Sequence, residues 1–184
     1  SEYYLGMIEV SNPPKSPKRL AKSQEKAINY FKNYIEKAPD GRFALKSIEE
    51  IIKLDKSLSN YDNLLIAKGY YANGEFEKSK NFLNKTTLAE SWSDFAKNEY
   101  KLGNKEKGNY YTELGLKQHA GNTAQEDVYE VIDNYVAAAA TRTEGITKLV
   151  NLGVSSTGAD YIAYLNCNEV VDSSVKEACF RSLY

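Results

Sequence analysis

Apolar residues recur along this chain at steps of three and four positions, and no segment shows sustained alternation of apolar and polar residues. Steps of three and four place side chains on one face of an α-helix, whereas alternation places them on one face of a β-strand. One apolar stripe runs from Leu20 to Ala38, and a second runs from Ala44 to Ile52. The pattern therefore predicts a protein that is all-α.

Capping signals divide the pattern into short helices. A Ser or Thr followed three residues later by Asp or Glu can form a capping box, in which each side chain bonds a backbone N–H at the helix start. Such pairs occur at Ser59/Asp62, Thr87/Glu90, Thr123/Glu126, Thr141/Glu144, Thr157/Asp160 and Ser174/Glu177. Turns that contain glycine, such as Asn73-Gly74, are expected to end several helices. The predicted helices span residues 2–10, 17–38, 41–55, 60–73, 75–85, 89–102, 104–120, 123–140, 142–152, 157–167 and 173–184.

Two successive pairs of these helices follow a tetratricopeptide-like pattern, in which small and aromatic residues recur at set positions of a helical hairpin. Stacked hairpins need small residues where helices cross closely and aromatic residues to fill the grooves beside them. The predicted close-approach positions are Ala67, Gly69, Ala96, Gly108 and Gly115, and the predicted wedges are Tyr70, Phe76, Trp92, Phe95 and Tyr100. We therefore expect residues 1–184 to form a single right-handed α-α superhelix, a solenoid of such hairpins.

The composition, charge and motifs of the chain limit the classes of function that the sequence supports. Hydrophobic residues make up 42% of the chain and charged residues 27%, as in an ordinary folded protein, and the net charge of −1 gives no global attraction to nucleic acid. No apolar run approaches the roughly 20 residues needed to span a bilayer. The sequence contains no phosphate-binding loop, nucleophile elbow or zinc-protease motif, so no catalytic residue and no cofactor is predicted. Because the chain has no initiator Met, we expect it to be a piece of a longer protein.

The chain has 15 tyrosines, several of them in adjacent pairs. Such rings can pack between helices with the hydroxyl reaching water or a carbonyl, or they can stack on sugars or grip a peptide. Packing accounts for most of them, and outward rings remain as contacts. The predicted contact region lies between Tyr70 and Tyr111, with Tyr71 and Tyr111 as the candidate ligand or partner contacts.

Two cysteines and one histidine are candidates for a disulfide or a metal site. Cys167 and Cys179 are either joined by a disulfide between adjacent helices, which would imply an oxidising compartment, or are two buried free thiols. No metal site is predicted, because His119 is the only histidine and lies far from both cysteines in sequence. We expect His119 to interact with the dipole at a helix end.

Several segments together resemble the helical superhelix region of bacterial soluble lytic transglycosylases, in particular the cyanobacterial kind. The resemblance rests on "AINYFKNYIEKAPDGRFALKSIEEI", "NLLIAKGYYANGEFEKSKNFLNKTTLAESW", "FAKNEYKLGNKEKG" and "YLNCNEVVDSSVKEACFRSLY". Within "AESW", Glu90 is similar to the glutamic acid that begins the active-site helix of that family, but no other catalytic motif follows it. We therefore interpret Glu90 as part of a helix cap, and the chain alone as non-catalytic.

The resemblance implies an exported, periplasmic scaffold that positions a peptidoglycan glycan strand or holds a partner beside a catalytic domain elsewhere in the parent enzyme. The alternative is a tetratricopeptide-type adaptor that binds a protein or peptide and has no link to glycans, in which case a cytoplasmic location is expected. Neither hypothesis involves nucleic acid or a membrane span in this chain.

Overall fold

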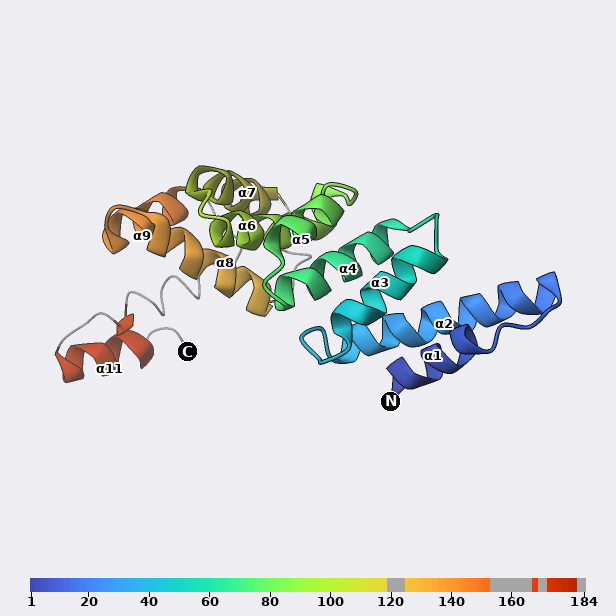
Figure 1. The fold of residues 1–184 in the computed structure, drawn as a ribbon. Coiled ribbons are helices and arrows are strands. Elements are labelled where there is room, and N and C mark those ends of the chain that lie inside the picture. Colours follow the sequence, from blue (N-terminus) through green and yellow to red (C-terminus); the bar gives the residue numbers. More distant parts are fainter. Residues whose placement is uncertain (119–124, 153–166, 169–171, 182–184) are drawn as a thin grey trace. The chain divides into compact units, whose positions relative to one another are not determined.

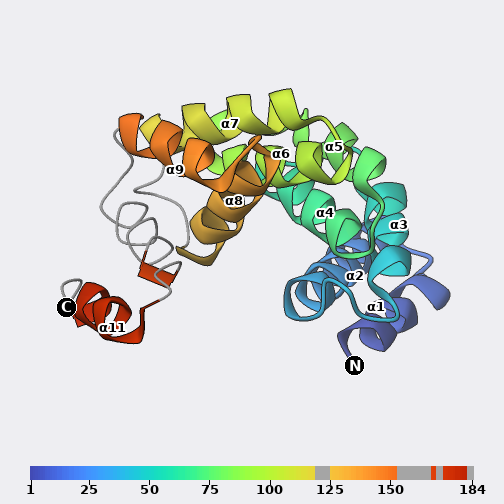
Figure 2. The same cartoon turned by 90° about the vertical axis from the view of Figure 1, so that its left-hand side faces the viewer.

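A computed structural model describes residues 1–118, 125–152, 167–168 and 172–181, apart from the side chains at 125–126 and 179–181. Ten helices and no strands occur in this part of the chain, so the prediction of an all-α protein is confirmed (Figures 1 and 2). Each of these helices begins and ends within three residues of its predicted bounds. The predicted helix at 157–167 lies outside the described residues except for its last residue. No helix in the described part is long and apolar enough to cross a membrane.

Residue contacts divide the chain into two compact units, Ser1–Thr87 and Leu88–Tyr184. The first unit contains α1 (Glu2–Ser11), α2 (Pro17–Lys37), α3 (Ala44–Leu54), α4 (Asn60–Ala72) and α5 (Phe76–Leu83). In sequence order, α1 packs on α2, α2 on α3, and α4 on α5, while α4 also contacts both α2 and α3. Each helix of this unit thus packs mainly on its neighbours in the chain, as expected for consecutive hairpins.

The core of the first unit is formed by the apolar stripes that the sequence pattern predicts. Phe31 and Ile35 of α2 are fully buried together with Ile48 and Ile51 of α3 and Ile66 of α4. Tyr3 of α1 extends this cluster and stacks on Phe43, with ring centroids 4.3 Å apart. The helices associate because these faces leave water, which is worth roughly 25 cal/mol for each Å² of apolar surface.

The second unit contains α6 (Leu88–Lys101), α7 (Lys105–Gln118), α8 (Gln125–Ala138), α9 (Arg142–Asn151) and α11 (Ser173–Arg181). Helices α6 and α7 form a hairpin, α8 packs against both of them, and α9 packs on α8. Its core includes Trp92, Ala96, Leu116, Val128, Val131, Ile132, Tyr135, Val136, Ile146 and Leu149. Trp92 is the only tryptophan of the chain and is 1% exposed, so its fluorescence reports on the packing of this unit.

Glycines lie directly beneath aromatic rings at helix crossings. A Cβ atom at Gly115 would overlap the Trp92 ring, and one at Gly108 would approach the Tyr100 ring to 2.5 Å. In the first unit, a Cβ atom at Gly69 would lie 2.8 Å from Ile48 Cδ1. Real Cβ atoms do not make contacts this short, so the predicted close-approach role of these three glycines is confirmed. The close packing requires glycine despite its low helix propensity.

Several helix ends agree with the predicted signals. Ser59 and Asp62 form a complete capping box at the start of α4, and the Thr141 side chain accepts a hydrogen bond from the Glu144 N–H. Gly74 and Gly103 end α4 and α6 in the left-handed region, with φ of 76° and 79°. No side chain crowds either glycine, so it is the backbone conformation that favours glycine at these two turns.

The predicted cap at Ser174 is wrong. Helix α11 begins at Ser173, and the Asp172 carboxylate accepts hydrogen bonds from the backbone N–H groups of Ser174 and Val175. Ser174 instead donates its hydroxyl to Asp172 Oδ1 at 2.6 Å. An aspartate is as good an N-cap as serine and also complements the helix dipole, so the earlier residue caps this helix.

We predict that Gly115→Ala destabilises the second unit by about 1–3 kcal/mol, although alanine is the better helix former. The added methyl group cannot fit without displacing the Trp92 ring. Urea unfolding followed by far-UV circular dichroism measures the loss. In the Trp92→Leu background the same substitution is expected to cost less, because a smaller side chain leaves room for the methyl group. Equal costs in both backgrounds would contradict this assignment of the strain.

We predict that Asp62→Asn removes an acid-sensitive contribution to the stability of the first unit. The pKa of Asp62 is lowered below its usual value, so its carboxylate stabilises the fold above about pH 4, and this contribution is lost as the pH falls through the lowered value. The free energy of unfolding, measured in urea by circular dichroism, should therefore fall more steeply from pH 5 to pH 2 in the unchanged protein than in the variant. Glu50→Gln, which alters an exposed pair with Lys53, is the control. Identical pH profiles for all three proteins would refute the prediction.

Candidate functional site

The two predicted contact residues lie in different units, Tyr71 on α4 and Tyr111 on α7. Both rings are half-buried. Tyr71 meets Phe76 edge to face with ring centroids 5.4 Å apart, and Tyr111 stacks on Phe95 at 5.0 Å. Each ring therefore packs on another aromatic ring and keeps part of its surface accessible, which is compatible with a contact role. No ligand contact tests that role, and it stays a prediction.

In the adjacent pair Tyr110-Tyr111, the exposed ring is that of Tyr110, at 59% exposure, and not that of Tyr111. The pair meets edge to face, with ring centroids 5.3 Å apart. Adjacent positions on a helix point about 100° apart, so when Tyr111 packs against Phe95 its neighbour must turn toward water. Tyr110 thus offers the larger accessible ring on α7 for stacking on a planar or sugar ligand.

The strongest electrostatic feature of the second unit is a buried lysine among three carboxylates. Lys97 of α6 places its ammonium 2.6 Å from Asp127 Oδ1 and 3.6 Å from Glu130 Oε2, both on α8. It also lies 3.7 Å from Asp94 Oδ1, one turn earlier on α6. The Lys97 side chain is only 8% exposed. This charge cluster ties α6 to α8.

The carboxylates control the charge state of Lys97. Burial alone would lower the pKa of its ammonium, but the negative charges of Asp94, Asp127 and Glu130 outweigh that effect and raise the pKa above its usual value. The ammonium therefore stays protonated at neutral pH and cannot serve as a nucleophile or general base there. The cluster is a structural ion pair network and not a catalytic one.

Buried tyrosines in the same unit have their hydroxyls bonded. Tyr135 donates to Glu113 Oε1 at 2.6 Å, and Tyr100 donates to Asn109 Oδ1 at 2.9 Å. Burial raises the pKa of both phenols well above 10, so neither forms a phenolate near neutral pH. These hydroxyls connect α6 with α7 and α7 with α8, and they have no role as proton donors to an external substrate.

In the first unit, polar side chains likewise form hydrogen bonds and ion pairs that hold its helices and loops together. Asp62 is bonded by Ser59 and lies 2.5 Å from Lys32 Nζ on α2. Burial alone would raise the pKa of this carboxyl, but the hydrogen bonds from Lys32 and Ser59 lower it overall. The Asn73 amide donates to Pro39 O at 2.8 Å and to Gly69 O at 2.7 Å, which fixes the end of α4 against the α2–α3 loop.

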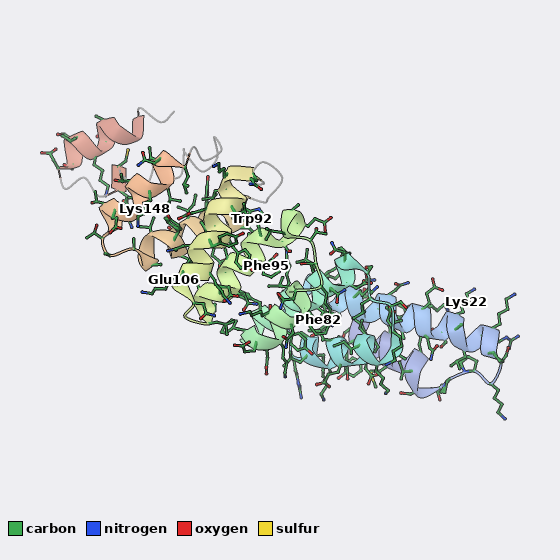
Figure 3. The ribbon with its side chains drawn as sticks, turned by 90° about the horizontal axis from the view of Figure 1, so that it is seen from above. Lys22, Phe82, Trp92, Phe95, Glu106 and Lys148 are labelled. Carbon is green, nitrogen blue, oxygen red and sulfur yellow. The ribbon has the colours of Figure 1, made fainter. Side chains whose placement is uncertain are left out.

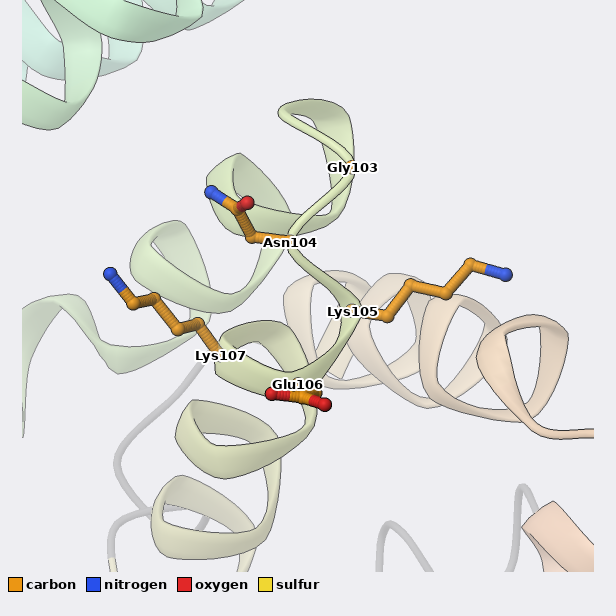
Figure 4. A pocket seen from close by; sticks show the side chains of 5 residues that line it. All are labelled: Gly103, Asn104, Lys105, Glu106 and Lys107. Atoms are coloured by element: carbon orange, nitrogen blue, oxygen red, sulfur yellow. The ribbon is translucent and has the colours of Figure 1, made fainter.

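A shallow pocket of about 380 Å³ is lined by Gly103, Asn104, Lys105, Glu106 and Lys107, at the start of α7. Figure 4 shows the Lys105 and Lys107 side chains pointing away from each other, with Glu106 between them. A small-molecule site needs several polar groups that converge on the ligand within an apolar cavity. These side chains do not converge, so the pocket does not form such a site.

The remaining predicted residues have different outcomes. Cys167 is buried and disulfide-bonded, but the side chain of Cys179 lies outside the described residues, so the pairing of the two stays a prediction. His119 also lies outside the described residues.

Glu90 is exposed in the first turn of α6, unlike the buried acid that protonates a glycosidic oxygen. In the part of the chain that is described, no group of acidic, histidine and cysteine side chains could hold a metal ion.

The sequence pattern assigned no role to Lys97 or to its acidic neighbours, so the buried Lys97 cluster was not predicted. The only available signal was the spacing of Asp94 and Lys97, and of Asp127 and Glu130, by three residues each. Such pairs occur on many exposed helices, and only the packing of α6 against α8 brings the two pairs together.

No protein-family model, curated protein or solved structure matches this chain.

We predict that Lys97→Met destabilises the second unit by about 3–5 kcal/mol, because three carboxylates lose the cation that compensates them. Urea unfolding followed by Trp92 fluorescence measures the effect. The matched control is Lys148→Met, which alters an exposed pair with Glu144 and should leave the free energy of unfolding nearly unchanged, because water and salt screen an exposed pair. A loss no larger in Lys97→Met than in the control would show that the cluster is not stabilising.

Proposed function

We propose that this chain is a non-catalytic helical scaffold, the superhelical region of a periplasmic peptidoglycan lytic transglycosylase, and that it positions a glycan strand or a partner. In this proposal the hairpins of both units continue one right-handed tetratricopeptide-like superhelix over residues 1–184. The observation that carries it is the close helix packing at Gly69, Gly108 and Gly115, each beneath a large side chain. Packing of this kind is typical of stacked helical hairpins, whose usual role is to present an extended surface.

The chemistry of the described residues supports a scaffold. Lys97 is held protonated by its carboxylates, Tyr100 and Tyr135 are neutral and bonded, and Glu90 is exposed. A glycosidase needs two carboxylic groups about 5–10 Å apart, one of them poised to donate a proton. Glu90 is exposed, so in this proposal the parent enzyme supplies the acid and its partner elsewhere.

Half-buried and exposed tyrosines are suited to glycan binding. Aromatic rings bind sugars through their apolar faces, and the phenol hydroxyl adds a hydrogen bond. Tyr71 and Tyr111 are half-buried, and Tyr110 is largely exposed. The alternative function is a tetratricopeptide-type adaptor for a protein or peptide. It is favoured by the exposed apolar stripe of α1, because Tyr4, Leu5 and Ile8 offer the kind of surface that protein partners cover.

The test is co-sedimentation of the chain with insoluble purified peptidoglycan, together with analysis of the soluble products. We predict that the chain pellets with peptidoglycan and releases no glycan fragments. Tyr71→Ala with Tyr111→Ala should weaken the binding by roughly tenfold, because each lost stacking contact is worth about 0.5–1.5 kcal/mol.

Tyr61→Ala is the control, since Tyr61 is exposed but lies outside the predicted contact region. If the unchanged protein stays in the supernatant, the transglycosylase proposal fails and the adaptor alternative stands. If glycan fragments are released, the non-catalytic assignment is wrong.

A further inference from the structure

The most basic segment of the chain is the turn between α1 and α2 with the first turns of α2. Residues 12–26 contain five cations and one anion, a net charge of +4, whereas the whole chain carries −1. The rest of the chain is therefore net negative. We call Lys15, Lys18, Arg19, Lys22 and Lys26 the basic tip.

All five side chains of the basic tip are exposed. Lys26 lies 3.7 Å from Glu9 Oε1 of α1, and the other four form no ion pair within the described part of the chain. Arg19, Lys22 and Lys26 are three and four positions apart, so they share one face of α2. Figure 3 shows Lys22 projecting from α2 near the end of the hairpin. Glu9 offsets the charge of Lys26, and the charges of Arg19, Lys22, Lys15 and Lys18 produce a local positive potential despite the negative net charge.

The helix start adds to this potential. Helix α2 begins at Pro17, and its N-cap Ser16 makes no side-chain hydrogen bond to the first turn. The free N–H groups of a 21-residue helix carry a partial positive charge, which here adds to that of Lys15, Lys18 and Arg19.

The neighbouring helix of the same hairpin exposes apolar side chains. Tyr4, Leu5 and Ile8 are 56%, 44% and 60% exposed and lie on the side of α1 opposite the buried Tyr3 and Gly6. Ile8 is three residues from the end of α1, where the basic turn begins. A surface that combines cations with exposed aliphatic and tyrosine side chains matches the interface of an anionic bilayer, where phosphates and acyl chains are both within reach.

From this combination we infer that the α1–α2 hairpin binds the surface of an anionic membrane through the basic tip, with Leu5 and Ile8 entering the headgroup region. A bilayer uses both the charged and the apolar side chains, whereas a nucleic-acid backbone uses only the charged ones. No aromatic ring lies among the five cations to stack on bases. The rest of the chain is net negative and is repelled by an anionic membrane, so only this end of the hairpin would make the contact. The inference does not rest on the proposed scaffold function.

The experiment is co-sedimentation of the chain with vesicles of phosphatidylcholine that contain about one-third phosphatidylglycerol, at about 0.05 M salt. Each cation near such a surface contributes about a fivefold gain in binding. The combined substitutions Lys15→Gln, Lys18→Gln, Arg19→Gln and Lys22→Gln should therefore weaken binding on the order of several hundredfold. Vesicles of pure phosphatidylcholine should bind the unchanged protein far more weakly.

The matched control removes the same charge from the second unit through Lys101→Gln, Lys105→Gln, Lys107→Gln and Lys117→Gln, all at exposed positions. This variant should bind anionic vesicles within about threefold of the unchanged protein, because its basic tip is intact. Leu5→Ser with Ile8→Ser should weaken vesicle binding about tenfold or more through lost apolar contact. Far-UV circular dichroism establishes that each variant is folded.

Four results would overturn the inference. One is equal loss of binding in the two charge variants, and a second is equal binding to neutral and anionic vesicles. The third is tighter binding to a single-stranded oligonucleotide than to anionic vesicles at the same phosphate concentration, which would identify the tip as a nucleic-acid contact. Unchanged vesicle binding by the Leu5 and Ile8 variant would count against membrane entry and would limit the contact to lipid phosphates, contrary to the proposal.

Discussion

The contact between the Trp92 ring and the bare backbone at Gly115 determines how closely α6 and α7 approach, and the rest of the second unit depends on that distance. With the hairpin closed around Trp92, the ring becomes part of the core that Leu116, Val128 and Ile132 complete. A methyl group at Gly115 would separate the helices and open this core, because protein interiors are packed too densely to absorb it. Gly108, which precedes Gly115 on α7, packs beneath the Tyr100 ring in the same way.

Close helix packing also explains how the polar groups are arranged. Residues Ser91–Glu99 of α6 are all buried, including the ionisable Asp94, Lys97 and Glu99. Charges buried in this way must be compensated, and Lys97 meets carboxylates of α8 while Glu99 accepts a hydrogen bond from Asn104 at 2.7 Å. The three buried charged residues of this helix, Asp94, Lys97 and Glu99, therefore help to fix its position. What the unit offers to other molecules is its outer surface.

The two units differ in the character of that surface. In the first unit the α1–α2 hairpin combines exposed cations with exposed Leu5 and Ile8, a combination suited to a charged and partly apolar partner. In the second unit, α7 exposes the Tyr110 ring at its surface, which is suited to stacking. A scaffold with separate surfaces of this kind can hold one partner while a second contact anchors it. Neither surface requires a catalytic residue.

The sequence by itself determined the helices, their ends and most of the core. Helical periodicity, capping boxes and glycine turns depend on interactions between residues only a few positions apart, so they can be recognised without the tertiary structure. The pair Ser59 and Asp62 and the glycines at 74 and 103 behave as predicted for that reason. Only the tertiary structure decided that Lys97 is buried among carboxylates of another helix and that Tyr110 and not Tyr111 is the exposed ring. It also decided that Lys15, Lys18, Arg19 and Lys22 have no ion-pair partner among the described residues. These outcomes depend on which faces of different helices meet. That is a non-local property, and the spacing of charges or tyrosines along one helix does not encode it.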